Sequence, residues 1–166
     1  MKIKNLNRLK QKIARMPDEA RKEIRAAMAV SAGEIVETAK AFAPVKSGDL
    51  RNSIGYTFGE YRPDNANVRG VSAKGGKHDL SVTIHAGDQK AWYAALVEFG
   101  TAPHVIRPRE RGGFLSFLGL SVAAVRHPGA EPHPFFNPAV RLGRKRAMNR
   151  IGRAVSKAAR NVAASK

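Results

Sequence analysis

The stretch from residue 91 to residue 139 constrains the fold most, because the most apolar run of the chain lies here among frequent Gly and Pro residues. Short apolar runs that are separated by Gly and charged turns are typical of antiparallel strands. We expect a short helix that ends at Gly100, and then an antiparallel meander with strands at about 104–108, 114–118 and 120–127. The pattern predicts that the rest of the chain is built around this sheet.

Two helices are predicted on either side of this region. From residue 17 to residue 43, apolar side chains recur every three to four positions on one narrow face. The residues of this face are Ile24, Met28, Ser31, Ile35 and Phe42. Burying its four large side chains should contribute about 1.5–3 kcal/mol each. A second helix is expected from Asn137 or Pro138 nearly to the end, with a shallow apolar arc of Ala147, Met148, Ile151, Ala154, Val155, Ala158 and Val162.

The region between the helices, residues 44–136, is predicted to hold the sheet. Apolar residues alternate with polar ones around Tyr56 and again around Val82, which indicates two strands. The segment 59–79 between them is rich in Pro, Asn, Gly and Lys, and we interpret it either as a solvated loop or as an extended arm that grips a neighbour. Residues 1–16 are predicted to form a helical extension at the N-terminus.

The expected architecture is therefore α+β. A long N-terminal amphipathic helix and a C-terminal helix pack on a small, mainly antiparallel sheet that carries an extended loop or arm. At 166 residues the length favours a single domain over the whole chain, 1–166.

The charge of the chain is strongly positive. Thirty Lys and Arg against thirteen Asp and Glu give +17, and such a field attracts polyanions and acidic protein surfaces. The last helix concentrates this charge on a basic face made of Arg146, Arg150, Arg153, Lys157 and Arg160. Non-specific phosphate contact, a merely solvated face and docking on an acidic neighbouring subunit all stay open. The basic face has no interleaved aromatic residues, so base-specific reading is not expected.

Signals for catalysis, cofactors or metals are weak. The chain has no Cys, which excludes a disulfide framework, a thiolate metal site and a cysteine nucleophile. No Ser lies in a G-x-S-x-G pattern and no His has metal-ligand spacing. Glu98 is the one acid in an apolar turn, and we expect it to pair with an Arg or to cap backbone N–H groups. We expect neither an enzyme nor a cofactor.

Membrane insertion is not expected either. The basic N-terminus lacks the apolar core of a signal peptide. The longest apolar stretch, residues 114–125, is shorter than the roughly 20 residues that a membrane span needs. We expect a soluble chain that is made in a cytoplasm.

Three motifs together resemble one protein family. APVKSGDLRNSI (43–54), YAALVEFGT (93–101) and VRHPGAEPHPFFNPA (125–139) are similar to the tail-component family of HK-type long-tailed phages, which also has prophage and gene-transfer-agent versions. The segment HVIRPRERGGFLSFLG (104–119) resembles a strand pair of that family.

The resemblance implies a structural α+β subunit of a ring in the virion neck, the head-tail junction, assembled in the host bacterial cytoplasm. Its role would be tail completion, tail termination or head-tail joining. The implied partners are further copies in a hexamer or a dodecamer, the portal, adaptor or stopper and tail-tube proteins, and, less specifically, packaged DNA. The expected subunit-interface residues are Leu50, Arg51, Tyr93, Glu98, Phe99, Pro134, Phe135 and Phe136. The alternative function is a non-specific nucleic-acid-binding protein.

Overall fold

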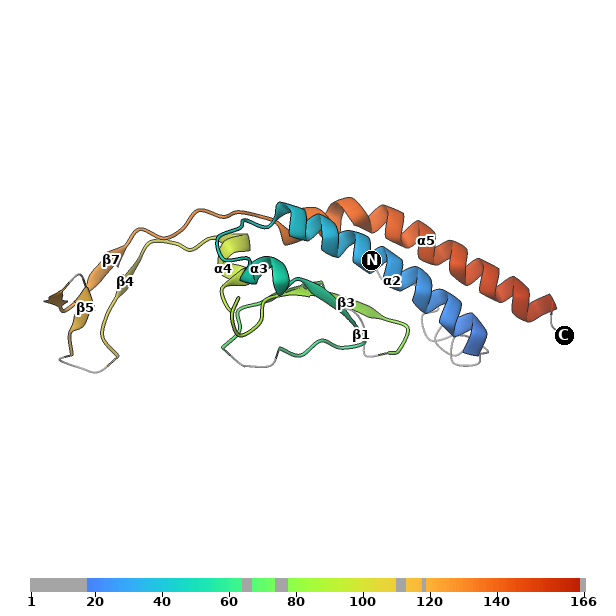
Figure 1. The fold of residues 1–166 in the computed structure, drawn as a ribbon, viewed down its shortest axis with the longest axis horizontal. Helices are drawn as coiled ribbons and strands as arrows, with labels where there is room; N and C mark the ends of the chain where they lie inside the picture. Colours follow the sequence, from blue (N-terminus) through green and yellow to red (C-terminus); the bar gives the residue numbers. More distant parts are fainter. Residues whose placement is uncertain (1–17, 64–66, 74–77, 110–112, 118, 165–166) are drawn as a thin grey trace.

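The fold is α+β, with two long helices, a three-stranded sheet and a separate projecting ribbon (Figure 1). The computed structural model describes residues 18–63, 67–73, 78–109, 113–117 and 119–164. The helical extension expected for residues 1–16 lies outside these ranges. The helices are α2 (Asp18–Phe42), α3 (Asp49–Asn52), α4 (Ala94–Phe99) and α5 (Phe136–Ala164). The strands are β1 (Gly55–Phe58), β2 (Val71–Ala73), β3 (Val82–Ala86), β4 (His104–Ile106), β5 (Leu115–Phe117), β6 (Leu120–Val122) and β7 (Val125–His127).

The two long helices lie side by side along the molecule and run in opposite directions (Figure 1). The predicted face of α2 is buried at Ile24, Met28, Ser31 and Ile35. Phe42 is exposed, contrary to the prediction, because it is the last residue of α2, where the chain leaves the helix pair.

The contact between α2 and α5 is close where the C-terminal part of α2 meets the N-terminal part of α5. A Cβ atom on Gly143 would lie 2.4 Å from Cγ1 of Ile35, so only a glycine allows this spacing. Toward the far end of the pair, Ala158 is fully buried against α2. Met148 is exposed, so the apolar arc of α5 is narrower than predicted: small residues face α2, and Met148 lies outside the contact.

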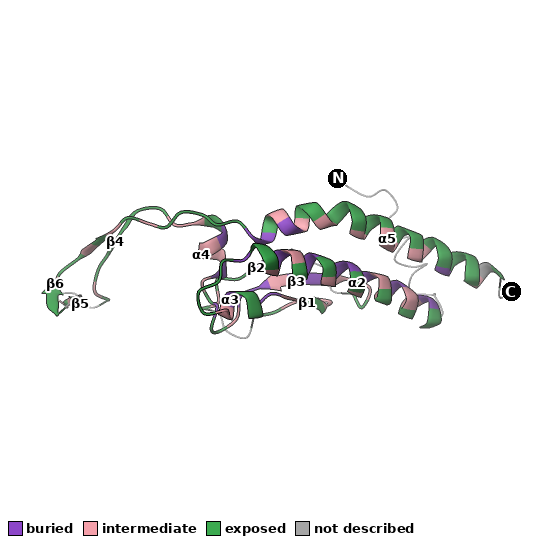
Figure 2. Ribbon diagram, turned by 45° about the horizontal axis from the view of Figure 1, so that its top comes forward, coloured by how far each residue is buried: buried purple, intermediate pink, exposed green. Residues whose placement is uncertain are grey.

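The three-stranded sheet has the order β1-β3-β2, and both pairs are antiparallel. Tyr56 lies opposite Ile84 in the first pair, and Val71 lies opposite Ala86 in the second. One face of the sheet is covered by α2, and α5 packs mainly on α2 rather than on the strands (Figure 2).

The segment 59–79 does not form a loop or arm throughout, because it contains the edge strand β2. It also returns to the body through one side-chain and one backbone hydrogen bond. Tyr61 Oη donates to the carbonyl of Gly87 (3.1 Å), and the Arg69 N–H donates to the carbonyl of Trp92 (2.9 Å). The part of this segment that the structure describes therefore packs on its own subunit.

The predicted central meander is instead an arm that projects away from the body (Figures 1 and 2). We call residues 101–130 the arm. Its strand β4 pairs with β7, and β5 pairs with β6, so β4 and β5 are not neighbours as a meander requires. Neither pair joins the sheet of β1, β2 and β3. The core lies between α2, α4, α5 and that sheet, with Phe135 and Phe136 as its largest fully buried side chains.

Candidate subunit interface

The base of the arm is held by the carboxylate of Glu98, the one buried acid among the described residues. Its Oε2 atom accepts hydrogen bonds from the backbone N–H groups of Phe135 (2.8 Å) and Phe136 (2.9 Å), and its Oε1 atom accepts one from Asn137 (2.9 Å). Phe136 and Asn137 begin α5 and Phe135 directly precedes it; at the start of a helix the N–H donors have no partner within the helix and the dipole favours a negative charge. The predicted capping role of Glu98 is confirmed, and the cap joins α4 to α5 across the arm.

Backbone hydrogen bonds hold the two sides of the arm together where they leave the body. Thr101 and Ala130 exchange hydrogen bonds of 2.9 and 3.1 Å. Gly129, at a φ of +89°, comes so close that a Cβ atom would lie 2.2 Å from the carbonyl oxygen of Thr101. A side chain cannot be accommodated there. The His133 N–H donates to the carbonyl of Val97 (2.8 Å), which ties the returning strand to α4.

The residues predicted for the subunit interface divide into two groups. Four of them are buried inside the chain, which leaves no side-chain surface for a second subunit: Leu50, Glu98, Phe135 and Phe136. The other four have accessible surface, namely Arg51, Tyr93, Phe99 and Pro134, and their interface role stays a prediction.

The arm exposes large apolar side chains, and sequence reasoning missed this because it took apolar runs as buried strands. Phe114 is 69% exposed and Leu120 is 66% exposed, while Val105 and Ile106 on β4 are also exposed. A two-stranded ribbon is marginally stable in water, and contiguous exposed apolar surface marks an interaction site. The arm therefore has the composition of a contact surface for another chain.

Most of the predicted basic face ties α5 to α2. Arg150 contacts Glu34 at 2.6 Å and donates to Ser31 Oγ at 3.2 Å, and Lys157 contacts Glu23 at 2.6 Å. The hydrogen bond from Arg150 lowers the pKa of the Glu34 carboxyl. Arg146 also approaches Glu34, at a longer distance of 3.9 Å.

Two residues of the basic face remain on the outer side of α5. Arg153 and Arg160 have no ion pair with any described residue. They border a shallow hollow over Gly152, where the helix carries no side chain. This hollow is the part of the basic face that is available to an acidic partner.

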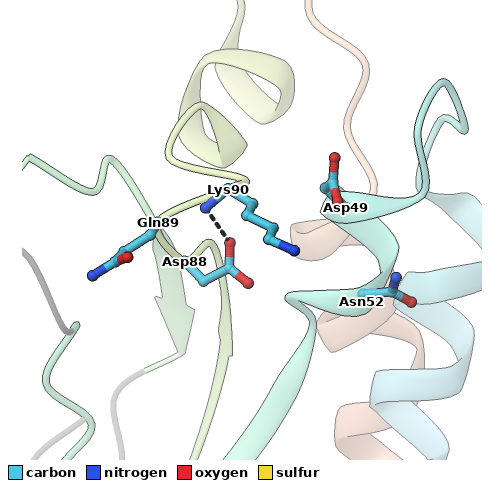
Figure 3. A pocket seen from close by; sticks show the side chains of 5 residues that line it. All are labelled: Asp49, Asn52, Asp88, Gln89 and Lys90. Carbon is cyan, nitrogen blue, oxygen red and sulfur yellow. Dashed lines mark hydrogen bonds between the residues drawn. The ribbon is translucent and has the colours of Figure 1, made fainter.

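A small polar pocket lies between α3 and the loop that precedes α4 (Figure 3). Its lining residues are Asp49, Asn52, Asp88, Gln89 and Lys90. Asp88 Oδ1 accepts hydrogen bonds from the N–H groups of Lys90 (2.9 Å) and Ala91 (2.7 Å), so this carboxylate shapes the turn into α4. Among the described residues that line it, none is a Ser, Thr or His that could form a nucleophile–base pair.

The histidines show no metal-binding arrangement in the described part of the chain. His85 stacks on Tyr61 with ring centroids 3.7 Å apart, and its burial lowers its pKa below the ordinary value of 6.5. Within the described ranges, no three or more His, Asp or Glu side chains are grouped so that they could hold a metal ion. Among the helices described, none has both the length and the apolar character needed to cross a membrane.

A family model matches residues 7–100, which is more than half of the chain's 166 residues. The family is HK97-gp10-like, with the description "Bacteriophage HK97-gp10, putative tail-component". No curated protein and no solved structure matches the chain. The matched region includes α2, α3, the three-stranded sheet and α4, and it ends at the base of the arm.

Proposed function

This chain belongs to the HK97-gp10-like family of bacteriophage tail components, and we propose that it forms a ring at the head-tail junction of the virion. Its role there would be tail completion, tail termination or head-tail joining. The proposal assigns the chain a structural task, without catalysis and without a cofactor.

The observation that carries the proposal is the arm. A body with its own core, clustered around Phe135 and Phe136, does not need the described residues of the arm, which lie away from it. The arm leaves the body at a point held by two backbone hydrogen bonds, and it exposes apolar side chains such as Phe114 and Leu120. These features suit a segment that becomes covered when copies assemble.

A ring fits the two kinds of surface on this subunit. The arm lies at one end of the molecule, and we propose that the surface that receives it is different from the arm itself. Contacts between unlike surfaces repeat head to tail and close into a ring when the rotation permits. We propose a hexamer, with a dodecamer as the alternative.

The outer side of α5 is proposed to contact the layers above or below the ring. Arg153 and Arg160 are not neutralised by α2, so they are available to carboxylates of a portal, adaptor, stopper or tail-tube protein. Such contacts would be weakened by salt, because exposed ion pairs are screened.

Imaging of the particle tests the location. Particles assembled with a tagged copy of this chain should show a symmetric ring of extra density between capsid and tail. A control assembled with the untagged chain should lack the tag density. Tag density at the tail tip, on the capsid or along the tail tube would overturn the proposal.

A second candidate function is non-specific binding to nucleic acid, for which the uncompensated charge of α5 is the supporting observation. This helix holds eight basic residues and no acidic ones, and only three of them contact carboxylates of α2. The test is an electrophoretic shift on random DNA over a range of salt concentrations. Replacing Arg153 and Arg160 by Gln should reduce the salt slope by about two if both contact phosphates, while an unchanged slope would exclude these contacts.

A further inference from the structure

We infer that the arm of one copy docks on the α3–α4 face of a neighbouring copy. We call this face the socket: the polar pocket of Figure 3 together with the exposed Val45 and Trp92, which precede α3 and α4 in the chain. The inference rests on the proposed assembly of identical subunits and adds which two surfaces meet.

The arm does not cover itself or its own body. It lies away from the body in both views, and the backbone hydrogen bonds between Thr101 and Ala130 fix the point where its two strands leave (Figures 1 and 2). Its strands have three residues each and pair only in twos, so they cannot bury Val105, Phe114 and Leu120 between layers. A cover for these side chains has to come from another chain.

The socket offers apolar surface of a matching kind. Val45 and Trp92 are about half exposed on the body, and along the chain each lies within four residues of a pocket residue, Asp49 and Lys90 respectively. An interface of this type needs an apolar centre with a polar rim, and aromatic residues such as Trp are favoured anchors.

Charge favours the same pairing. Arg107, Arg109 and Arg126 of the arm form no ion pair with any residue that the structure describes. On a chain with a net charge of +17, free carboxylates are scarce. Asp49 and Asp88 have no ion-pair partner within the described ranges and share one pocket, although Lys90 lies beside them.

Six of the other described carboxylates are less suitable for receiving the arm. Five of them already contact a basic side chain of their own subunit: Glu23, Glu34, Glu37, Glu60 and Asp79. Glu98 is buried as the cap of α5. Asp18, Glu19 and Glu131 are also exposed and have no ion pair with a described residue, but Asp49 and Asp88 differ from them because they line one pocket together. We therefore infer that the cationic arm finds its carboxylate partners at the socket.

The absence of cysteine from the chain makes disulfide trapping a direct test. Three valines with similar exposure supply the positions: Val105 on the arm (50%), Val45 at the socket (59%) and Val30 on α2 as the control (53%). Each single-cysteine variant of the full chain is made in two sizes, with and without a fusion tag. Pairs of variants are mixed and oxidised mildly, which also traps transient encounters.

The expected result is a mixed disulfide between V105C and V45C. Its yield should exceed that of V105C with V30C by on the order of tenfold, because docking raises the effective concentration of the two thiols. Equal yields for the two pairs would overturn the inference. A dominant V105C–V105C product would also overturn it, since that product means that arms meet arms.

The contribution of charge is tested with the double variant Asp49→Asn and Asp88→Asn. Asn keeps the oxygen that accepts from the turn before α4, so the pocket should hold its shape. The V105C–V45C yield should fall by about two- to fivefold, as expected for exposed ion pairs, and an unchanged yield would refute the role of the carboxylates. If particles show the ring while the V105C–V45C disulfide is absent, the socket is wrong and the proposed function stands.

Discussion

Replacing Glu98 by Ala should remove the cap that holds the long C-terminal helix to the body. In the native chain its two carboxylate oxygens accept three N–H groups at 2.8–2.9 Å. Alanine offers no acceptor, and the N–H groups of Phe135 and Phe136 are too deeply buried for water to replace it. The third donor, on the more exposed Asn137, can be hydrated instead.

The magnitude follows from those two buried donors. A buried group that loses its partner costs about 1–3 kcal/mol, and bonds to a charged acceptor lie at the upper end of that range. We therefore expect Glu98→Ala to lower the free energy of unfolding by about 3–5 kcal/mol, a large part of the 5–15 kcal/mol typical of a domain. Glu98→Gln keeps one acceptor oxygen without the charge, so its loss should be about half as large.

Urea unfolding followed by far-UV circular dichroism measures the effect. The matched control is Glu37→Ala, which removes an exposed carboxylate of α2 that contacts Lys40 at 3.0 Å. That change should stay within about 0.5 kcal/mol of the parent chain. If Glu98→Ala were as mild as Glu37→Ala, the interpretation of Glu98 as the clamp of the arm and α5 would be wrong.

Three further predictions concern the helix pair, the pH dependence and the socket. Gly143→Ala should destabilise the chain by about 1–3 kcal/mol, because the added methyl group would meet Ile35. Gly152→Ala, in open space on the same helix, should stabilise the chain by about 0.5–1 kcal/mol. Equal urea midpoints for the two variants would contradict the close helix contact. Burial lowers the pKa of His85 below 6.5, so the unfolded chain binds the proton more readily than the folded chain. The free energy of unfolding should therefore fall as the pH drops below 6.5, and this loss should be smaller in His85→Gln. Identical losses in the two chains would refute the role of His85. Trp92 is the only tryptophan and is half exposed, so its emission should shift to shorter wavelength as the protein concentration rises, and a constant spectrum up to saturation would count against coverage of the socket.

The helices and the sheet strands β1 and β3 could be predicted from the sequence because local periodicity carries their signal. Ile24, Met28 and Ile35 recur at helical spacing and face the core, and Ile84 and Ala86 alternate as a half-buried strand requires. Strand β2 escaped detection, because three residues between Gly70 and a Lys- and Gly-rich segment carry no alternation.

The arm could not be recognised from the sequence, because an apolar run has the same composition whether its own subunit or another chain covers it. The composition around Phe114 and Leu120 therefore predicts the centre of the fold, although these residues lie outside the core. The cap of Glu98 was one of two roles expected for an acid in an apolar turn. Its partners lie 37–39 residues away, and only the tertiary structure identifies them.

The basic face illustrates a similar limit. A helical wheel places Arg150 and Lys157 opposite the apolar arc, but long side chains reach around the helix to Glu34 and Glu23 of α2. Which cations remain available depends on where the partner helix lies. The sequence alone does not show where the partner helix lies.

A reconstruction of the neck of particles that contain this chain would test the central claim most directly, at a resolution that traces the chain from Gly100 to Pro134. The account predicts a closed ring between capsid and tail in which every arm lies on the α3–α4 face of the next subunit. Arms that extend into solvent or fold onto their own subunits, or particles without such a ring, would contradict it.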